Sequence, residues 1–365
     1  MKTVRINLSE RSYNIYVGHG IMKNLRFLVD FELPQGPFFI VTNKKINRLH
    51  GSSLRKALKP FCRKTLFFEV PDSEKSKSFP VYIKTIRRLA RLAKKTKPLV
   101  FAFGGGVIGD LAGFVASAYR RGVPYIQVPT TLLAQVDSAI GGKVAIDIKE
   151  AKNIVGNFYQ PKMVLCESDF LKTLPKKELR NGMAEVIKYG IISDGNLFGY
   201  IEKNMDKILK ADPDALSHIV FRSCSIKAGV VEKDEADIKN IRAVLNFGHT
   251  VGHAMEAASR YSGQFAHGQA VAEGMIMASL ISFRIGILKK RDLDRICCLI
   301  RRLFKKTDTG RLSTKEILKA LAYDKKFIYG VNRFILPERI GNAKIVDKVP
   351  GEIIKTVVEE NVKKC

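Results

Sequence analysis

Four short apolar runs in the first half of the chain place the strongest constraint on its fold. They cover residues 37–43 (PFFIVTN), 98–106 (PLVFAFGGG), 124–131 (PYIQVPTT) and 163–168 (MVLCES). Each has the length and the β-branched or aromatic content of a strand that is buried on both faces. The segment 81–95, between two of these runs, has the apolar spacing of a helix. Because buried strands joined by helices are typical of parallel sheets, we predict a doubly wound α/β fold here.

Long helical segments replace the strand pattern after Leu174 and Pro175. They cover residues 178–192, 213–233, 247–259 and 269–288. A chain of 365 residues with 46% hydrophobic residues is long enough for two hydrophobic cores. We therefore predict two domains, an α/β domain over residues 1–174 and a mostly α-helical domain over residues 175–365. The interface between two such domains is a common place for a ligand cleft.

The composition argues against several classes of protein. No stretch approaches the ~20 apolar residues that span a bilayer, and the first residues alternate like an edge strand instead of forming a signal peptide. The six cysteines contain no CxxC pair, which disfavours a disulfide scaffold and a thiolate zinc site. These features predict a soluble, cytoplasmic protein without a membrane partner.

The net charge of +28 raises nucleic acid as a possible partner. However, the basic residues fall in short separate runs with little aromatic interleaving, such as those at residues 94–97 and 301–306. We therefore favour a basic, solvated surface and predict no nucleic-acid partner.

A glycine-rich turn follows the second of the apolar runs. Residues 104–110 (GGGVIGD) satisfy the pattern GxGxxG after a strand and before a helix. Glycines let the backbone approach a pyrophosphate, and the N–H groups at the start of a helix bind it. A tight structural turn would explain the pattern alone, but the strand before it and the helix after it favour a dinucleotide. Asn43, Thr130 and Thr131 end other strands, and residues 72–77 form a polar turn that could hold a ribose.

A group of histidines and one glutamate marks the helical half. His249 and His253 are four residues apart, which places both on one face of a helix. His267 follows after a loop, and Glu185 lies in an otherwise apolar helix, where an unpaired carboxylate would be costly. Together they predict a metal site with room for water or substrate. The spacing leaves open whether His253 is a ligand or a proton-transfer group.

Several cationic residues lie in glycine-rich or apolar surroundings where a solvated surface explains them poorly. They are Arg121, Lys143, Lys152, Lys188, Lys227 and Arg242, with amide side chains nearby at Asn153 and Asn246. Any one of these lysines could be an ordinary surface residue. Together they predict a pocket for a polyanion such as a phosphorylated carboxylic acid.

An ordered set of motifs resembles the 3-dehydroquinate synthase family of sugar-phosphate cyclases. The motifs run from about residue 40 to 340 and read GGGVIGDLAGFVAS, RRGVPYIQVPTTLLAQVDSAIGGK, KNIVGNFYQP, LKTLP, MAEVIKYG, LNFGHTVGHAME and HGQAVAEGM. The resemblance implies a Rossmann-like dinucleotide-binding domain followed by a metal-binding helical domain. It also implies a homodimer in which Arg121 reaches the site of the neighbouring subunit. Ala151, Gln269 and Asp147 depart from the usual family residues, which blurs the fine geometry of the pocket.

The resemblance also implies which residues act on each ligand. The metal, zinc or cobalt, would be held by Glu185, His249 and His267. NAD would be contacted by Asn43, Asp72, Ser73, Glu74, Lys75, Ser76, Lys77, Gly106, Val107, Ile108, Gly109, Asp110, Thr130, Thr131, Asp137, Lys143, Lys152, Phe170, Leu171, Lys172 and Thr173. The substrate would be bound or transformed by Arg121, Lys143, Lys152, Asn153, Lys188, Lys227, Arg242, Asn246, His253 and either Lys325 or Lys326.

The implied reaction converts 3-deoxy-D-arabino-heptulosonate 7-phosphate to 3-dehydroquinate and phosphate in the shikimate pathway. It proceeds through transient oxidation by bound NAD, phosphate elimination, re-reduction and an intramolecular aldol closure. Other cyclases, such as 2-deoxy-scyllo-inosose or amino-dehydroquinate synthases, and oxidoreductases resembling glycerol dehydrogenase remain alternatives. Arg242 and Lys227 favour a substrate with a carboxylate, which argues against the inosose enzyme.

Overall fold

The chain forms two compact units in the computed structural model. The structure describes residues 1–61, 63–259, 266–304, 314–323 and 332–362. One unit contains residues 1–179 and 210–236, and the other contains residues 180–209 and 237–365. The units therefore alternate along the sequence, and the helix α5 (Lys176–Ile192) begins in the first and continues in the second.

A seven-stranded sheet organises the first unit. Its order is β1 (Lys2–Ile6), β2 (Tyr13–Gly18), β9 (Met163–Glu167), β6 (Tyr125–Pro129), β5 (Leu99–Gly104), β3 (Phe38–Asn43) and β4 (Thr65–Val70). Only the pairing of β1 with β2 is antiparallel among these strands. All four predicted apolar runs form central strands, which confirms the α/β prediction for this unit.

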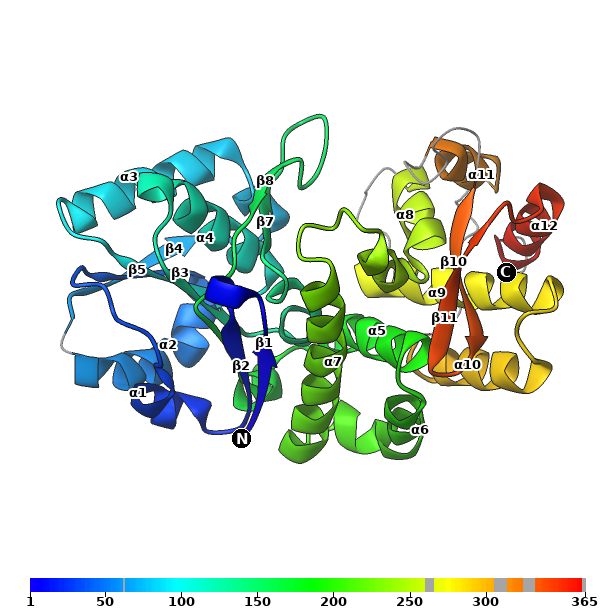
Figure 1. The fold of residues 1–365 in the computed structure, drawn as a ribbon, viewed down its shortest axis with the longest axis horizontal. Helices are drawn as coiled ribbons and strands as arrows, with labels where there is room; N and C mark the ends of the chain where they lie inside the picture. The colour runs from blue at the N-terminus through cyan, green and yellow to red at the C-terminus, as the bar shows by residue number, and fades with distance from the viewer. Residues whose placement is uncertain (62, 260–265, 305–313, 324–331, 363–365) are drawn as a thin grey trace. The chain divides into compact units, whose positions relative to one another are not determined.

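The helices of the first unit cover both faces of the sheet. They are α1 (Leu25–Leu28), α2 (Lys44–Leu58), α3 (Phe79–Ala93), α4 (Gly106–Ala118) and α7 (Pro213–Lys233). Within β3, Phe38 and Ile40 join the core beneath α1 and α2. Phe39 and Val41 join the core beneath α3 and α4 on the opposite face (Figure 1). Because the side chains of residues 38–41 alternate between two cores, this part of β3 is continuously apolar, and the polar residues Thr42 and Asn43 follow at its carboxyl end.

Two features of the first unit lie outside the sequence prediction. The strands β7 (Lys143–Ile146) and β8 (Val155–Phe158) form an antiparallel hairpin that packs on α4. The helix α7 packs against β1 and β2, although its sequence lies in the mostly helical region after residue 175. The compact units describe contacts within the structure, so the predicted domain boundary between residues 174 and 175 stays a prediction.

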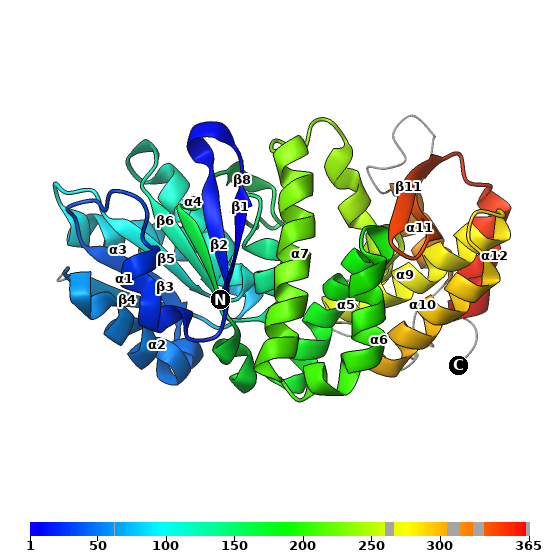
Figure 2. The same cartoon turned by 60° about the horizontal axis from the view of Figure 1, so that its bottom comes forward.

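The second unit is mostly helical, as predicted. Besides the end of α5, it contains α6 (Gly195–Leu209), α8 (His249–Ala258), α9 (His267–Arg284), α10 (Lys290–Leu303), α11 (Thr314–Tyr323) and α12 (Gly351–Val362). An antiparallel hairpin of β10 (Arg333–Arg339) and β11 (Asn342–Asp347) was not predicted. The helix α9 contacts α8, α10, α12 and β10 (Figure 2). No helix in the described part of the chain is both long and apolar enough to cross a membrane.

Glycines bring the backbones of α8 and α9 close together. A Cβ added at Gly274 would lie 1.9 Å from the carbonyl oxygen of Gly248 and 2.9 Å from the amide nitrogen of Gly252. Gly248 precedes α8 with φ of 81°, a conformation that L-residues with side chains rarely adopt. The first residues of these two helices, His249 and His267, are two of the predicted metal ligands. The close approach of the backbones therefore sets the distance between functional side chains.

We expect Gly274→Ala to destabilise the protein, because the added methyl group must push α8 away from α9. Overpacking of this kind costs about 1–3 kcal/mol or more. Gly199→Ala in α6 is the matched control, since a Cβ there meets nothing within 4 Å. This control should be neutral or stabilising, as alanine favours a helix over glycine. Thermal unfolding of the two variants measures the effect, and equal unfolding midpoints would contradict the expectation.

Candidate active site

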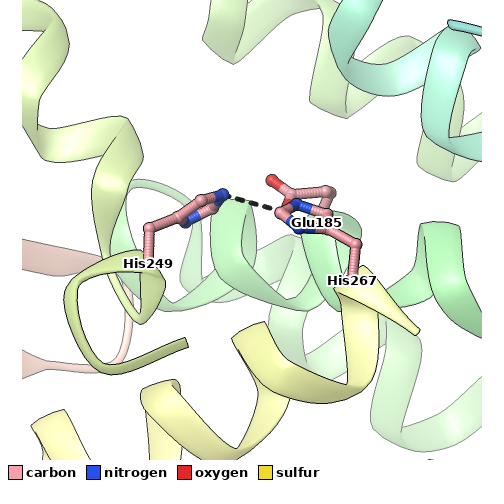
Figure 3. Close-up of side chains that lie close together, drawn as sticks. All are labelled: Glu185, His249 and His267. Atoms are coloured by element: carbon pink, nitrogen blue, oxygen red, sulfur yellow. Dashed lines mark ion pairs between the residues drawn. The ribbon is translucent and has the colours of Figure 1, made fainter. Parts of the chain in front are cut away.

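Three side chains from three helices of the second unit converge on one point. Glu185 lies within α5, and His249 and His267 begin α8 and α9. The Nε2 atom of His249 lies 3.5 Å from Oε1 of Glu185, and Nε2 of His267 lies 4.0 Å from the same oxygen (Figure 3). One ligand atom of each residue lies within 4.8 Å of the others. An ion with bonds of about 2.1 Å could be shared by atoms at these separations.

The electrostatics of this cluster fit a divalent cation. Glu185 is fully buried, and neither carboxylate oxygen accepts a hydrogen bond from the described residues. The ammonium group of Lys188, also buried, lies in ion-pair contact with Oε2. Lys188 compensates Oε2 only, and a cation bound at Oε1 would offset the remaining cost of burying this carboxylate. The donor set of one carboxylate and two imidazoles is one that zinc and related ions accept.

The environment of His249 favours the form of imidazole that binds metal. Burial, and next the positive charge of Lys188, hold the pKa of His249 well below its ordinary value, so the ring is neutral. Its Nδ1 atom lies 3.2 Å from the carbonyl oxygen of Phe247. Because a carbonyl only accepts, Nδ1 carries the proton and Nε2 keeps a lone pair directed at Glu185.

His253 lies beside this cluster, one turn after His249 on the same helix. Its ring centroid lies 5.3 Å from that of His249 and 6.1 Å from that of His267. The side chain is exposed, unlike that of His249. Glu185, His249 and His267 meet without it, so its role as a proton-transfer or phosphate-contacting group stays a prediction.

Two of the predicted cationic residues, Lys188 and Arg242, are buried in the second unit. Lys188 contacts Glu185, and Arg242 is 5% exposed within the 3-10 helix Ile241–Asn246, which ends at the predicted residue Asn246. Burying a positive charge costs free energy unless an anion lies next to it, which is consistent with the predicted pocket for an anionic ligand. Lys325 and Lys326 lie outside the described residues.

In the first unit, Lys227 on α7 is held by Asp137. Its ammonium group donates to the Asp137 backbone carbonyl at 2.7 Å and to its carboxylate at 2.5 Å. Asp137 lies in a π-helical segment, Ala134–Ser138, and such insertions are frequent at functional sites. The structure therefore joins a predicted substrate residue to a predicted NAD residue.

The glycine-rich turn connects β5 to α4 at the carboxyl ends of the parallel strands. Its glycines are required for space, because a Cβ at Gly104 would lie 2.6 Å from Ile108, and one at Gly106 would lie 3.0 Å from Ser138. The amide of Thr130, after β6, donates to the carbonyl oxygen of Gly104 at 2.9 Å. The turn and Thr130 therefore lie together at the edge where open α/β sheets bind ligands.

The polar turn at residues 72–77 is tied to two neighbouring segments. Asp72 accepts a hydrogen bond of 2.8 Å from Asn43, the last residue of β3. The buried ammonium group of Lys77 lies 2.8 Å from the Asp110 carboxylate on α4, 3.7 Å from Glu74 and 4.0 Å from Asp147, and it contacts Asn153. Lys77 therefore connects the polar turn, the first part of α4 and the segment that carries Asn153.

The charges around Lys77 are unbalanced, with three carboxylates facing one ammonium group. Burial, and less strongly the carboxylates of Glu74 and Asp147, raise the pKa of Asp110 to about 6 despite the opposing effect of Lys77. Burial lowers the pKa of Lys77, but Asp110, Glu74 and Asp147 together raise it by more, so the ammonium form is retained. Strongly perturbed groups of this kind are frequent at functional sites.

The remaining predicted residues have different surroundings. Phe170 and Leu171 are buried in the core, whereas Thr173, at the end of the same 3-10 helix, is 2.7 Å from Nε2 of His50. His50 lies on α2 and was not predicted, because a lone histidine within a helix carries no motif. Arg121 lies in a 3-10 turn, Lys143 begins β7, and Lys152 lies in the segment before β8. All three residues are exposed in the single chain.

The family models and the curated relatives that match this chain agree on one family. The family models described as 3-dehydroquinate synthase N-terminal and 3-dehydroquinate synthase C-terminal match residues 67–181 and 182–327. The 3-dehydroquinate synthase of Desulforamulus reducens is 42% identical over 369 residues, which cover 99% of this chain and 100% of the relative. That of Dictyoglomus thermophilum is 44% identical and covers 98% of each chain.

Among solved structures, the fold is similar to that of a sugar-phosphate cyclase relative. The 2-epi-5-epi-valiolone synthase of Streptomyces hygroscopicus, solved with NAD+ and Zn2+ bound, has a TM-score of 0.86 at 25% identity and covers 98% of this chain and 99% of its own. This similarity shows a shared fold, and the full-length sequence similarity to the synthases is more specific. The chain belongs to the 3-dehydroquinate synthase family.

Proposed function

We propose that this chain is a 3-dehydroquinate synthase, a phosphorus–oxygen lyase of the shikimate pathway, which leads to chorismate and the aromatic amino acids. Its substrate would be 3-deoxy-D-arabino-heptulosonate 7-phosphate, and its products 3-dehydroquinate and phosphate. The observation that carries the proposal is the cluster of Glu185, His249 and His267, in a chain 42% identical to such a synthase over nearly its full length. The cytoplasmic location and the homodimer are part of the same proposal.

The cofactors would be NAD and a divalent metal, zinc or cobalt. NAD would be held by the first domain, residues 1–174, and the metal by Glu185, His249 and His267 in the second, residues 175–365. Support comes from the valiolone synthase, solved with NAD+ and Zn2+, and from a 2-deoxy-scyllo-inosose synthase, solved with NAD+ and Co2+. When bound, NAD supplies a reversible hydride acceptor, and the metal supplies a Lewis acid that polarises a substrate oxygen.

The chain's own residues would bind and orient the anionic substrate and move its protons. Lys188 and Arg242 bring buried positive charge to the second unit, where solvent screens it little. The ammonium group of Lys227 is oriented by two contacts with Asp137, so less rotamer freedom is lost when it binds an anion. His253 is exposed beside the cluster and is the candidate for proton transfer or phosphate contact.

Sequence similarity favours this reaction over those of related cyclases. The 2-deoxy-scyllo-inosose synthase is only 23% identical, although its TM-score is 0.85. Because both enzymes have the same fold, the fold does not distinguish their substrates. The buried guanidinium of Arg242 suits a substrate carboxylate, which the heptulosonate has.

Phosphate release with limiting NAD tests the proposed function. We expect the enzyme to release many phosphates per NAD from the heptulosonate phosphate without lasting absorbance of NADH, because oxidation and reduction would use the same bound cofactor. Release should stop when NAD is removed. NADH that accumulates in proportion to product would instead indicate a dehydrogenase, and no phosphate release would reject the proposal.

We expect Lys77→Met to weaken NAD binding by about tenfold or more, because removing one partner of a buried ion pair leaves its carboxylates uncompensated. The polar turn and the start of α4 would then repel each other. Lys84→Met on the exposed face of α3 serves as the control and should bind NAD normally. Calorimetric titration of both variants with NAD measures the difference in affinity. Equal affinities of the two variants for NAD would show that the ion pairs of Lys77 do not contribute to NAD binding.

A further inference from the structure

The two histidines of the cluster use their ring nitrogens in the same way. Each directs Nε2 toward Oε1 of Glu185, at 3.5 Å for His249 and 4.0 Å for His267. Each directs Nδ1 toward an oxygen on the other side of the ring. For His249 this oxygen is the carbonyl of Phe247, at 3.2 Å, and for His267 it is Oε1 of Glu256, at 3.4 Å.

We propose that Glu256 is a positioning residue for His267. The Nδ1–H group of the imidazole donates a hydrogen bond to this carboxylate, so the ring keeps its proton on Nδ1 and its lone pair on Nε2, which faces Glu185. Metal-binding histidines usually donate their second ring nitrogen to a carboxylate or carbonyl, and this contact fixes the tautomer and makes the ring a better ligand. The inference rests on the proposed function, because it concerns the metal that the cluster would bind.

The helix α8 makes this arrangement possible. His249 and Glu256 are seven residues apart on α8, so both lie on the same face of the helix, two turns apart. One helix therefore carries a ligand at its start and the carboxylate that orients the ligand from α9. The side chain of Glu256 is 19% exposed, so water screens its contact with His267 only in part.

A second metal site is the alternative for the same residues. His253, Glu256 and His267 also bring ligand atoms within 4.8 Å of one another. However, His267 would then have to bind one ion through each ring nitrogen, and the second ion would lie on the more exposed side of the ring. We favour the orienting role, because His249 shows the same use of Nδ1 with a carbonyl oxygen.

Zinc binding to the metal-free protein tests the proposal through affinity and stoichiometry, measured by competition with a chelating dye. We expect wild type to bind one zinc ion per chain. Glu256→Ala should bind one ion about 10- to 100-fold more weakly, the usual effect of losing an outer partner of a ligand. Glu256→Gln keeps an acceptor oxygen without the charge, so its affinity should lie between the other two, below wild type by a few-fold. The visible spectrum of bound Co2+ should shift in Glu256→Ala, which a merely structural change elsewhere would not cause.

Glu360→Gln on α12 is the matched control, because it removes a carboxylate that pairs with Arg284 in the same unit. It should bind zinc like wild type. Unchanged zinc affinity in both Glu256 variants would overturn the proposal, as would two ions in wild type and one in Glu256→Ala. If Glu256→Ala does not fold, an unchanged affinity in Glu256→Gln alone would overturn it. Any of these results would reject the role of Glu256 but not the proposed function, provided that the wild-type enzyme releases phosphate. A wild-type protein that binds no divalent metal would reject both the role of Glu256 and the proposed function.

Discussion

His249→Ala should lose its bound metal together with its activity, whereas His253→Ala should keep the metal and lose about 10²- to 10⁴-fold in rate. Both residues lie on the same face of α8, one turn apart. They differ in surroundings, because His249 is buried with Nε2 directed at Glu185, and His253 is exposed. Removing one of three protein ligands leaves a divalent ion under-coordinated. A fourth protein ligand would occupy a position that the substrate needs.

Metal analysis of the two purified variants decides between these roles. Circular dichroism and thermal unfolding should first show that both variants are folded. Equal loss of metal from both would mean that His253 is a ligand, and its assignment to proton transfer or phosphate contact would be wrong. Full metal occupancy in His249→Ala would remove His249 from the proposed ligand set.

Mixed subunits should recover activity when one chain carries Arg121→Ala and the other carries Glu185→Ala. Each homodimer would be nearly inactive, because every site would lack one essential group. If Arg121 acts on the neighbouring subunit's site, one site of a mixed dimer has both groups intact. Up to half of the wild-type activity per mixed dimer is then expected, a large gain over either parent. Arg121 is exposed in the single chain and has φ of 63°, which holds it in a turn after α4.

Subunit exchange must be verified independently, for example with two affinity tags purified in sequence. Mixing two preparations of the Glu185→Ala chain under the same conditions controls for residual activity. Verified mixed dimers without activity would show that Arg121 acts within its own subunit or not at all. A protein that stays monomeric at all concentrations would reject the homodimer as well.

Much of the fold could be predicted because its signals are local. Residues 38–41 are all apolar, since neighbouring side chains of β3 face different cores, and a continuous apolar run of this kind is visible in the sequence. The hairpin of β10 and β11 could not be predicted in the same way. In β10 the buried apolar stretch covers only residues 334–337 and ends in a proline, and no residue of β11 is buried, so neither strand has the longer pattern that marks a strand in the sequence.

The sequence alone showed which types of residue the candidate site contains. A glycine-rich turn between a strand and a helix, and a glutamate in an apolar helix before paired histidines, are patterns within single elements. The structure brings Glu185, His249 and His267 together as those patterns suggested. The resemblance to the family added roles for these residues that no single motif contains.

Only the tertiary structure decided which of these residues contact each other. Lys77 faces Asp110 and Asp147, Lys227 faces Asp137 across 90 residues of sequence, and Glu256 faces His267. The physical reason is that periodicity reports which face of an element is buried, whereas an ion pair depends on which elements pack together and at what distance. In α8 and α9 that distance is set by glycines whose role is visible only when both backbones are in place.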